Sequence, residues 1–163
     1  GIFVAKSDIK GWPILGNLIG NAGTIFIDRT SRRSIINVLD KSKNLLAIGH
    51  TIVFFPEGTT SDGFRILPFY TSLFSLFLDN PQSKLLPIVI SYSKFGKKTS
   101  EPAYVDEMNL WDSILKVLSS SNLEIQIEVL EFTGRDHQLS HLNKSQKKRE
   151  LAEKIREKIS SKI

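Results

Sequence analysis

Residues 24–55 read TIFIDRTSRRSIINVLDKSKNLLAIGHTIVFF, and this stretch decides the fold. Two short and continuously apolar runs, Thr24–Ile27 and Thr51–Phe55, enclose a longer segment with helical period. Continuous apolar runs are typical of strands that are covered on both faces. Ser31 is placed to cap a helix that runs to about Ile48. A strand, a helix and a strand in this order predict a unit with two parallel strands.

The same alternation extends to both sides of this stretch. Further strands are expected at Ile2–Ala5, Leu86–Tyr92 and Leu123–Phe132. In the last of these, acidic and apolar residues interleave, which predicts a half-exposed edge strand. Further helices are expected from Pro13 to about Asn21, from about Leu67 to Asp79, from about Leu110 to Ser119, and at 144–163.

The fold class that follows is α/β, with a mainly parallel or mixed sheet flanked by helices and a basic C-terminal helix. We predict a domain at 1–133, a polar linker at 134–143 and the basic helix at 144–163. A chain of 163 residues is long enough to bury a core of its own.

Composition excludes several classes of protein. The chain has no Cys, so it has no disulfide scaffold and no thiol nucleophile. Its longest apolar stretch, Ile66–Leu78, is too short to cross a membrane. The net charge of +5 comes from 144–163, because the remaining residues hold equal numbers of acids and bases. Nucleic-acid binding is not expected, since that helix carries no recognition motif.

Polar groups follow the ends of the first three predicted strands. Lys6 ends the first, Arg29 follows the second, and the small, hydroxyl-rich loop 57–63 follows the third. In an open parallel sheet, ligands bind beyond the carboxyl ends of the strands. A guanidinium, an ammonium and backbone N–H groups suit a phosphate, although solvated strand ends and a plain turn explain the same residues. Phe64 and Arg65 stand where a nucleotide-binding loop needs Lys and Ser or Thr, which excludes that motif.

Four segments together resemble the glycerolipid acyltransferases of the 1-acyl-glycerol-3-phosphate acyltransferase type. Gly23–Arg29 looks like the second conserved block of that family, and Phe55–Ser61 looks like its third, usually written Phe-Pro-Glu-Gly-Thr-Arg-Ser. Leu86–Ile90 is similar to the fourth block. Phe3–Lys6, followed by Trp12-Pro13, resembles the strand and helix that enter the second. Order and spacing agree from residue 1 to about 92.

The resemblance implies a membrane-associated enzyme of phospholipid biosynthesis, with its active site on the cytoplasmic side. It would move an acyl chain from acyl-CoA or acyl-carrier protein to the free hydroxyl of a lysophospholipid, with no cofactor and no metal. By carry-over, Arg29 would bind the acceptor's phosphate. The expected substrate-binding residues are Lys6, Arg29, Glu57, Gly58, Thr59 and Thr60. The Leu67–Asp79 helix and the one after Trp12 would flank an apolar acyl groove, unless the former is an ordinary core helix.

Two departures from the family pattern bear on function. The catalytic His-x-x-x-x-Asp block is absent from residues 1–163, and the resemblance places it before Gly1. We therefore expect a chain truncated at its N-terminus, and a non-catalytic phosphate-ligand or lipid-binding module is the alternative. Thr60 stands where the family commonly has Arg. This opens the acceptor to others, such as lyso-ornithine lipid, with Arg65 as a substitute cation.

The C-terminal helix has two readings. Leu151, Ile155, Ile159 and Ile163 recur every four residues and form a narrow apolar seam flanked by Lys and Arg. Either the basic face makes an auxiliary contact with an anionic membrane surface, or the helix is solvated and its seam packs on the domain.

Overall fold

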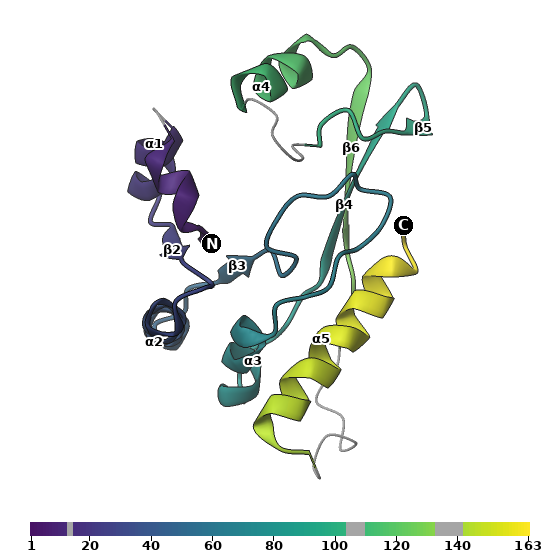
Figure 1. Ribbon diagram of the computed structural model, residues 1–163. Coiled ribbons are helices and arrows are strands. Elements are labelled where there is room, and N and C mark those ends of the chain that lie inside the picture. Colours follow the sequence, from purple (N-terminus) through teal and green to yellow (C-terminus); the bar gives the residue numbers. More distant parts are fainter. Residues whose placement is uncertain (13–14, 104–109, 133–141) are drawn as a thin grey trace. The chain divides into compact units, whose positions relative to one another are not determined.

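The computed structural model describes residues 1–12, 15–103, 110–132 and 142–163 (Figure 1). The chain forms two compact units, and each is described by itself. The first unit contains residues 1–58 and 70–84, and the second contains residues 59–69 and 85–163.

A three-stranded parallel sheet forms the centre of the first unit. Its strands are β1 (Ile2–Lys6), β2 (Ile25–Ile27) and β3 (Ile52–Phe54), in the order β2-β1-β3. Val4 of β1 lies opposite Ile25 on one side and Phe54 on the other. The predicted strand–helix–strand unit is therefore confirmed, with β1 inserted between its two strands.

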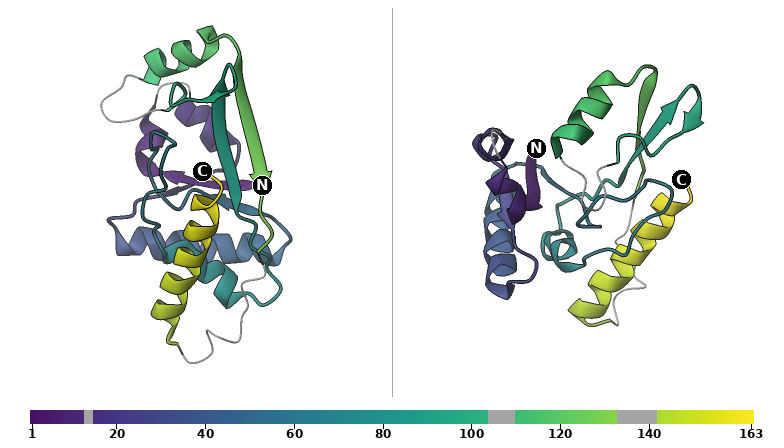
Figure 2. Two further views of the ribbon diagram at one scale, coloured as in Figure 1. Left: turned by 90° about the vertical axis from the view of Figure 1, so that its right-hand side faces the viewer. Right: turned by 45° about the horizontal axis from the view of Figure 1, so that its top comes forward.

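Helices cover both faces of this sheet (Figure 2). The 3₁₀ helix η1 (Ser7–Gly11) and α1 (Leu15–Asn21) follow β1, and α2 (Arg32–Ala47) follows β2. Ser31 caps α2 as predicted, because its hydroxyl accepts the N–H of Ser34 at 3.2 Å. A core cluster lies on the face covered by α2 and contains Val4, Ile25, Ile27, Val38, Leu73 and Leu76. On the other face Gly20 of α1 lies close to the ring of Phe26.

The helix expected from Leu67 to Asp79 is much shorter in the structure. Only η2 (Ser72–Phe74) and α3 (Ser75–Asp79) are helical. Pro68 disfavours helical backbone only at Leu67, the residue before it. The N–H of Tyr70 instead donates to Pro56 O at 2.8 Å. The short helix packs as a core element, with Leu76 and Phe77 buried.

The second unit contains an antiparallel sheet in the order β5-β4-β6. β4 (Ile88–Lys94) pairs with β5 (Lys97–Lys98) and, along its whole length, with β6 (Leu123–Val129). β6 is an edge strand, as predicted, but it ends three residues early. Its apolar side chains are exposed: Ile125 by 59%, Ile127 by 64% and Val129 by 58%. The alternating pattern therefore located the strand but did not identify a buried face.

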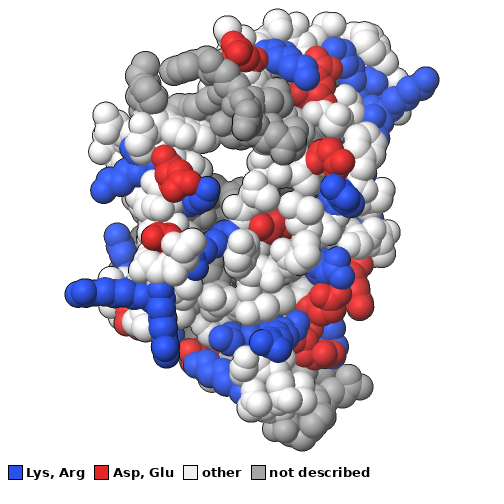
Figure 3. All heavy atoms as spheres, viewed as in Figure 1, with Lys and Arg blue, Asp and Glu red and all other residues white. Residues whose placement is uncertain are grey.

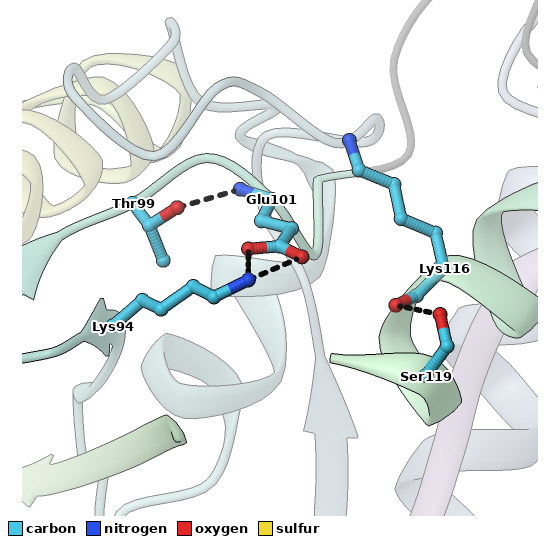
Figure 4. A network of polar contacts seen from close by, with 5 residues as sticks. All are labelled: Lys94, Thr99, Glu101, Lys116 and Ser119. Carbon is cyan, nitrogen blue, oxygen red and sulfur yellow. Dashed lines mark hydrogen bonds and ion pairs between the residues drawn. The ribbon is translucent and has the colours of Figure 1, made fainter. Parts of the chain in front are cut away.

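A polar network lies beside the hairpin of β4 and β5 (Figure 4). The Lys94 ammonium donates to both carboxylate oxygens of Glu101, at 2.7 and 3.0 Å, and the Glu101 N–H donates to the Thr99 hydroxyl at 3.1 Å. The hydrogen bond from Lys94 is the main cause that lowers the pKa of Glu101. On α4 (Leu110–Ser119) the Ser119 hydroxyl donates to Lys116 O at 3.2 Å. The carboxylate thus fixes the start of the segment that follows the hairpin.

The C-terminal helix α5 (Lys144–Ser160) begins with a capping box, in which Asn143 and Gln146 exchange two hydrogen bonds of 3.0 Å. Leu151, Ile155 and Ile159 are buried, so the structure supports a packed seam. Acidic and basic side chains are interspersed on the face shown in Figure 3. Within the described ranges, no helix combines the length and apolar character that crossing a membrane requires.

Candidate functional site

The site begins at the edge of the parallel sheet where three strands end. β1 ends at Lys6, β2 at Ile27 and β3 at Phe54, with β1 in the middle. Arg29 extends from the end of β2, and its Nη2 donates to Phe55 O, just beyond β3, at 3.1 Å. Because β1 lies between β2 and β3, this hydrogen bond joins segments that follow two strands that are not neighbours in the sheet. One cation therefore links the two outer strands at the edge where ligands bind in such sheets.

The turn between β2 and α2 fixes the backbone of Arg29. Asp28 accepts both the N–H and the hydroxyl of Thr30, at 2.9 and 2.6 Å. The Asp28 N–H donates to the Ser34 hydroxyl at 2.9 Å. The Thr30 hydroxyl is the main cause that lowers the pKa of Asp28. Asp28 is thus held as a carboxylate by the turn, and Arg29 leaves this turn from a defined position.

The guanidinium of Arg29 lies directly against Gly58. Gly58 has a φ of +75°, and a Cβ built there would lie 1.4 Å from Arg29 Nη1. The Gly58 N–H donates to Phe55 O at 3.2 Å, so this carbonyl oxygen accepts one hydrogen bond from the turn and one from the guanidinium. No residue with a side chain fits at 58 while Arg29 keeps this position. Arg29 Nη1 is itself buried, without a hydrogen-bond partner in the part of the chain that the structure describes.

Tyr70 covers the guanidinium of Arg29. The Arg29 Cζ lies 4.6 Å from the centre of the Tyr70 ring, a cation–π geometry. Partial burial lowers the pKa of Arg29 and the nearby Tyr70 raises it. The sequence did not identify Tyr70 as a site residue, since it lies outside the four segments that resemble the family. Only the fold of the chain places its ring beside Arg29.

The structure brings together only some of the predicted site residues. Arg29 and Gly58 are in contact, and Glu57 stands in the same turn. Lys6 forms its ion pair with Asp8. Thr59 and Thr60 belong to the second unit.

The space around Arg29 is small. A cavity of about 70 Å³ lies between Arg29, Tyr70 and the core, and it is mostly apolar. The lining residues are Ile27, Arg29, Ile35, Phe54, Pro56, Tyr70, Ser72 and Leu73. Drug-sized ligand pockets have volumes of about 300 Å³ or more, so this cavity does not hold an acyl chain. An open hollow of about 470 Å³ between β2 and α2 contains Arg33 and Lys41 but none of the predicted site residues.

Comparisons with known proteins agree with the conserved blocks. Residues 1–91 match the family model described as Acyltransferase. The chain is 37% identical over 126 residues to a 1-acyl-sn-glycerol-3-phosphate acyltransferase of Neisseria gonorrhoeae, which covers 77% of this chain and 49% of that protein. It is 32% identical over 176 residues to a lyso-ornithine lipid O-acyltransferase of Rhizobium meliloti (strain 1021), which covers 99% of this chain and 59% of that protein.

The chain thus spans about half of the length of the first relative and about three-fifths of the second. No solved structure matches it.

Proposed function

The chain belongs to the glycerolipid acyltransferase family, and from this premise we propose that its protein transfers a fatty acyl chain to the free hydroxyl of a lysophospholipid. The acceptor is of the 1-acyl-glycerol-3-phosphate type, and the donor is acyl-CoA or acyl-carrier protein. The reaction serves phospholipid biosynthesis at a membrane surface, with the active site on the cytoplasmic side.

The observation that carries this proposal is the guanidinium of Arg29 at the carboxyl edge of the sheet. It is held by Phe55 O, the Gly58 turn and the Tyr70 ring. A guanidinium recognises phosphate through two parallel hydrogen bonds when its plane is fixed. The buried Nη1 without a partner costs roughly 1–3 kcal/mol, which a phosphate oxygen that reached it would offset.

The chemical step needs a base, and the family's His-x-x-x-x-Asp block does not occur in residues 1–163. In the family's block, His takes the proton of the acceptor hydroxyl and Asp orients the imidazole. The hydroxyl oxygen attacks the thioester carbonyl, an ester bond forms, and the C–S bond breaks. The thiol then leaves with the proton that His had taken. We propose that this chain supplies the acceptor-anchoring half of that site.

A second acceptor is favoured by two specific observations. Thr60 removes the usual guanidinium from the third block, and the R. meliloti relative named for lyso-ornithine lipid aligns over 99% of the chain. Ornithine presents a carboxylate and an ammonium instead of a phosphate. One guanidinium suffices for a carboxylate, and Glu57 offers an anion for the ammonium.

The test is Arg29→Ala in the protein that carries this chain together with its catalytic block. Loss of charge-assisted hydrogen bonds worth about 1.5–3 kcal/mol predicts a rise of roughly 10- to 150-fold in the KM for lysophosphatidic acid. The KM for the acyl donor stays within twofold. Arg33→Ala on α2 is the matched control for loss of one positive charge, and it leaves both values unchanged.

Equal effects of Arg29→Ala on acceptor and donor contradict the proposal. Parallel assays with lyso-ornithine lipid identify the acceptor, because the true acceptor has the higher kcat/KM. If neither acceptor is acylated but lysophosphatidic acid still binds, the protein is the non-catalytic lipid-binding module instead.

A further inference from the structure

Tyr70 makes two contacts that tie it to Arg29. Its ring lies over the guanidinium at 4.6 Å, and its N–H donates to Pro56 O at 2.8 Å. The second contact attaches Tyr70 to the turn that carries Gly58. The ring and the turn therefore keep a fixed spacing, with the guanidinium between them.

Gly58 closes the other side of this arrangement. Its built Cβ would lie 1.4 Å from Arg29 Nη1 and 2.7 Å from Tyr70 Cε2, so the three groups meet at one point. A ring face that lies against a guanidinium limits the movement of that group. Arg29 Nη2 donates to Phe55 O, and Nη1 is the donor that has no hydrogen-bond partner in the described part of the chain. Bidentate recognition of an anion depends on the orientation of the guanidinium plane.

From this geometry we infer that Tyr70 is a positioning residue of the acceptor site, whose ring face sets the plane in which Arg29 presents its N–H donors to the acceptor's anionic headgroup. The inference rests on the proposed function, because it requires Arg29 to bind the acceptor. It assigns Tyr70 a role in acceptor affinity and none in the acyl-transfer step. The π face of the ring is the group that acts.

Two substitutions separate the ring face from the side-chain volume. Tyr70→Leu keeps an apolar side chain but lacks the ring, and we expect a rise of about 3- to 30-fold in acceptor KM. The values of kcat and donor KM stay within twofold. Tyr70→Phe keeps the ring face and stays within twofold of the unchanged protein in all three values.

A matched control is Phe64→Leu, which removes another aromatic–cation pair, with Lys98 Nζ 5.0 Å from the ring centre. It leaves acceptor KM unchanged. Tyr70 is 55% exposed, so the variants should fold, and thermal melting checks this. A series with phenylalanine, 4-fluorophenylalanine and 3,5-difluorophenylalanine at position 70 weakens the negative ring face stepwise. The logarithm of acceptor KM should rise with each fluorine.

A second readout does not depend on activity. In the 163-residue chain, the NMR signal of the Arg29 Nε–H group should carry a ring-current shift that Tyr70→Leu removes and Tyr70→Phe retains. A short-chain lysophosphatidic acid should move this signal in the unchanged chain, and it should do so at higher concentrations in Tyr70→Leu.

The outcomes distinguish the two proposals. If Arg29→Ala raises acceptor KM but Tyr70→Leu does not, the role of Tyr70 is refuted and the proposed function stands. If Tyr70→Phe is as damaging as Tyr70→Leu, the hydroxyl acts and the ring-face mechanism is wrong. If Arg29→Ala leaves acceptor KM unchanged, the proposed function itself fails.

Discussion

Replacing Gly58 by Ala tests the packing of the turn against Arg29 most directly. The added methyl group would overlap Arg29 Nη1, at 1.4 Å from the built Cβ. Because Nη1 is at the end of a flexible side chain, we expect Arg29 to swing away from the turn rather than the backbone to move. The side chain then loses its hydrogen bond to Phe55 O and its position under Tyr70.

The size of the effect has two parts. The φ of +75° costs an alanine about 1–2 kcal/mol regardless of its surroundings. Loss of the hydrogen bond and the ring contact destabilises the folded chain by about a further 1–2 kcal/mol. This loss stays small because the released guanidinium is hydrated again. For acceptor recognition the displacement amounts to loss of Arg29, so acceptor KM should rise by roughly tenfold or more.

Gly63→Ala is the matched control for this substitution. Gly63 has a φ of +78°, but its built Cβ meets nothing within 4 Å. Urea denaturation should show that the positive φ lowers the free energy of unfolding in both variants. Only Gly58→Ala should lose the additional stability that comes from the contacts of Arg29. In kinetic assays, acceptor KM should rise for Gly58→Ala alone. In an Arg29→Ala background, Gly58→Ala should add nothing to acceptor KM. Equal acceptor KM values for the two glycine variants would refute the reasoning.

Two further predictions concern stability. Ile155→Ala on α5 removes a buried side chain and should lower the free energy of unfolding by about 2–5 kcal/mol in urea titrations, whereas Ile163→Ala, at a 38% exposed position, should change it by less than 1 kcal/mol. Asp28 has a pKa below its ordinary value of 3.8 in the folded chain, so its stabilising effect is present above about pH 4 and is lost as the pH falls through the lower folded value. The urea midpoint should therefore drop less between pH 5 and pH 3 in Asp28→Asn than in the unchanged chain, and identical slopes would show that the Thr30 hydrogen bonds do not hold this carboxylate.

Local patterns were sufficient to predict most of the fold. The apolar runs located β1, β2 and β3, and the Ser31 cap located the start of α2, because strands and caps depend on neighbouring residues. The helix at Leu110–Ser119 has the predicted bounds. The segment after Leu67 was predicted wrongly, since its apolar character suited a buried helix, whereas the Tyr70 N–H donates to Pro56 O and helical backbone begins only at Ser72.

The candidate site could be predicted only in part, because its geometry depends on contacts between distant residues. Because ligands bind beyond the carboxyl ends of parallel strands, the sequence predicted that Arg29 and the turn after β3 lie at one edge if their strands are neighbours in the sheet. The close approach of Gly58 to Arg29 and the contact between Tyr70 and the guanidinium depend on side-chain paths that no spacing encodes. The ion pair between Lys6 and Asp8, two residues along the chain, is likewise a side-chain contact that the spacing did not reveal.

The hydrogen bond between the Tyr70 N–H and Pro56 O has a consequence for how this site can diversify. It joins the two ends of the segment 59–69, which belongs to the other unit. A loop whose ends are held together tolerates changes in length and sequence between them. Residues such as Thr60 can therefore be exchanged, or the segment replaced by that of a relative, while Gly58 and Tyr70 keep their contacts with Arg29.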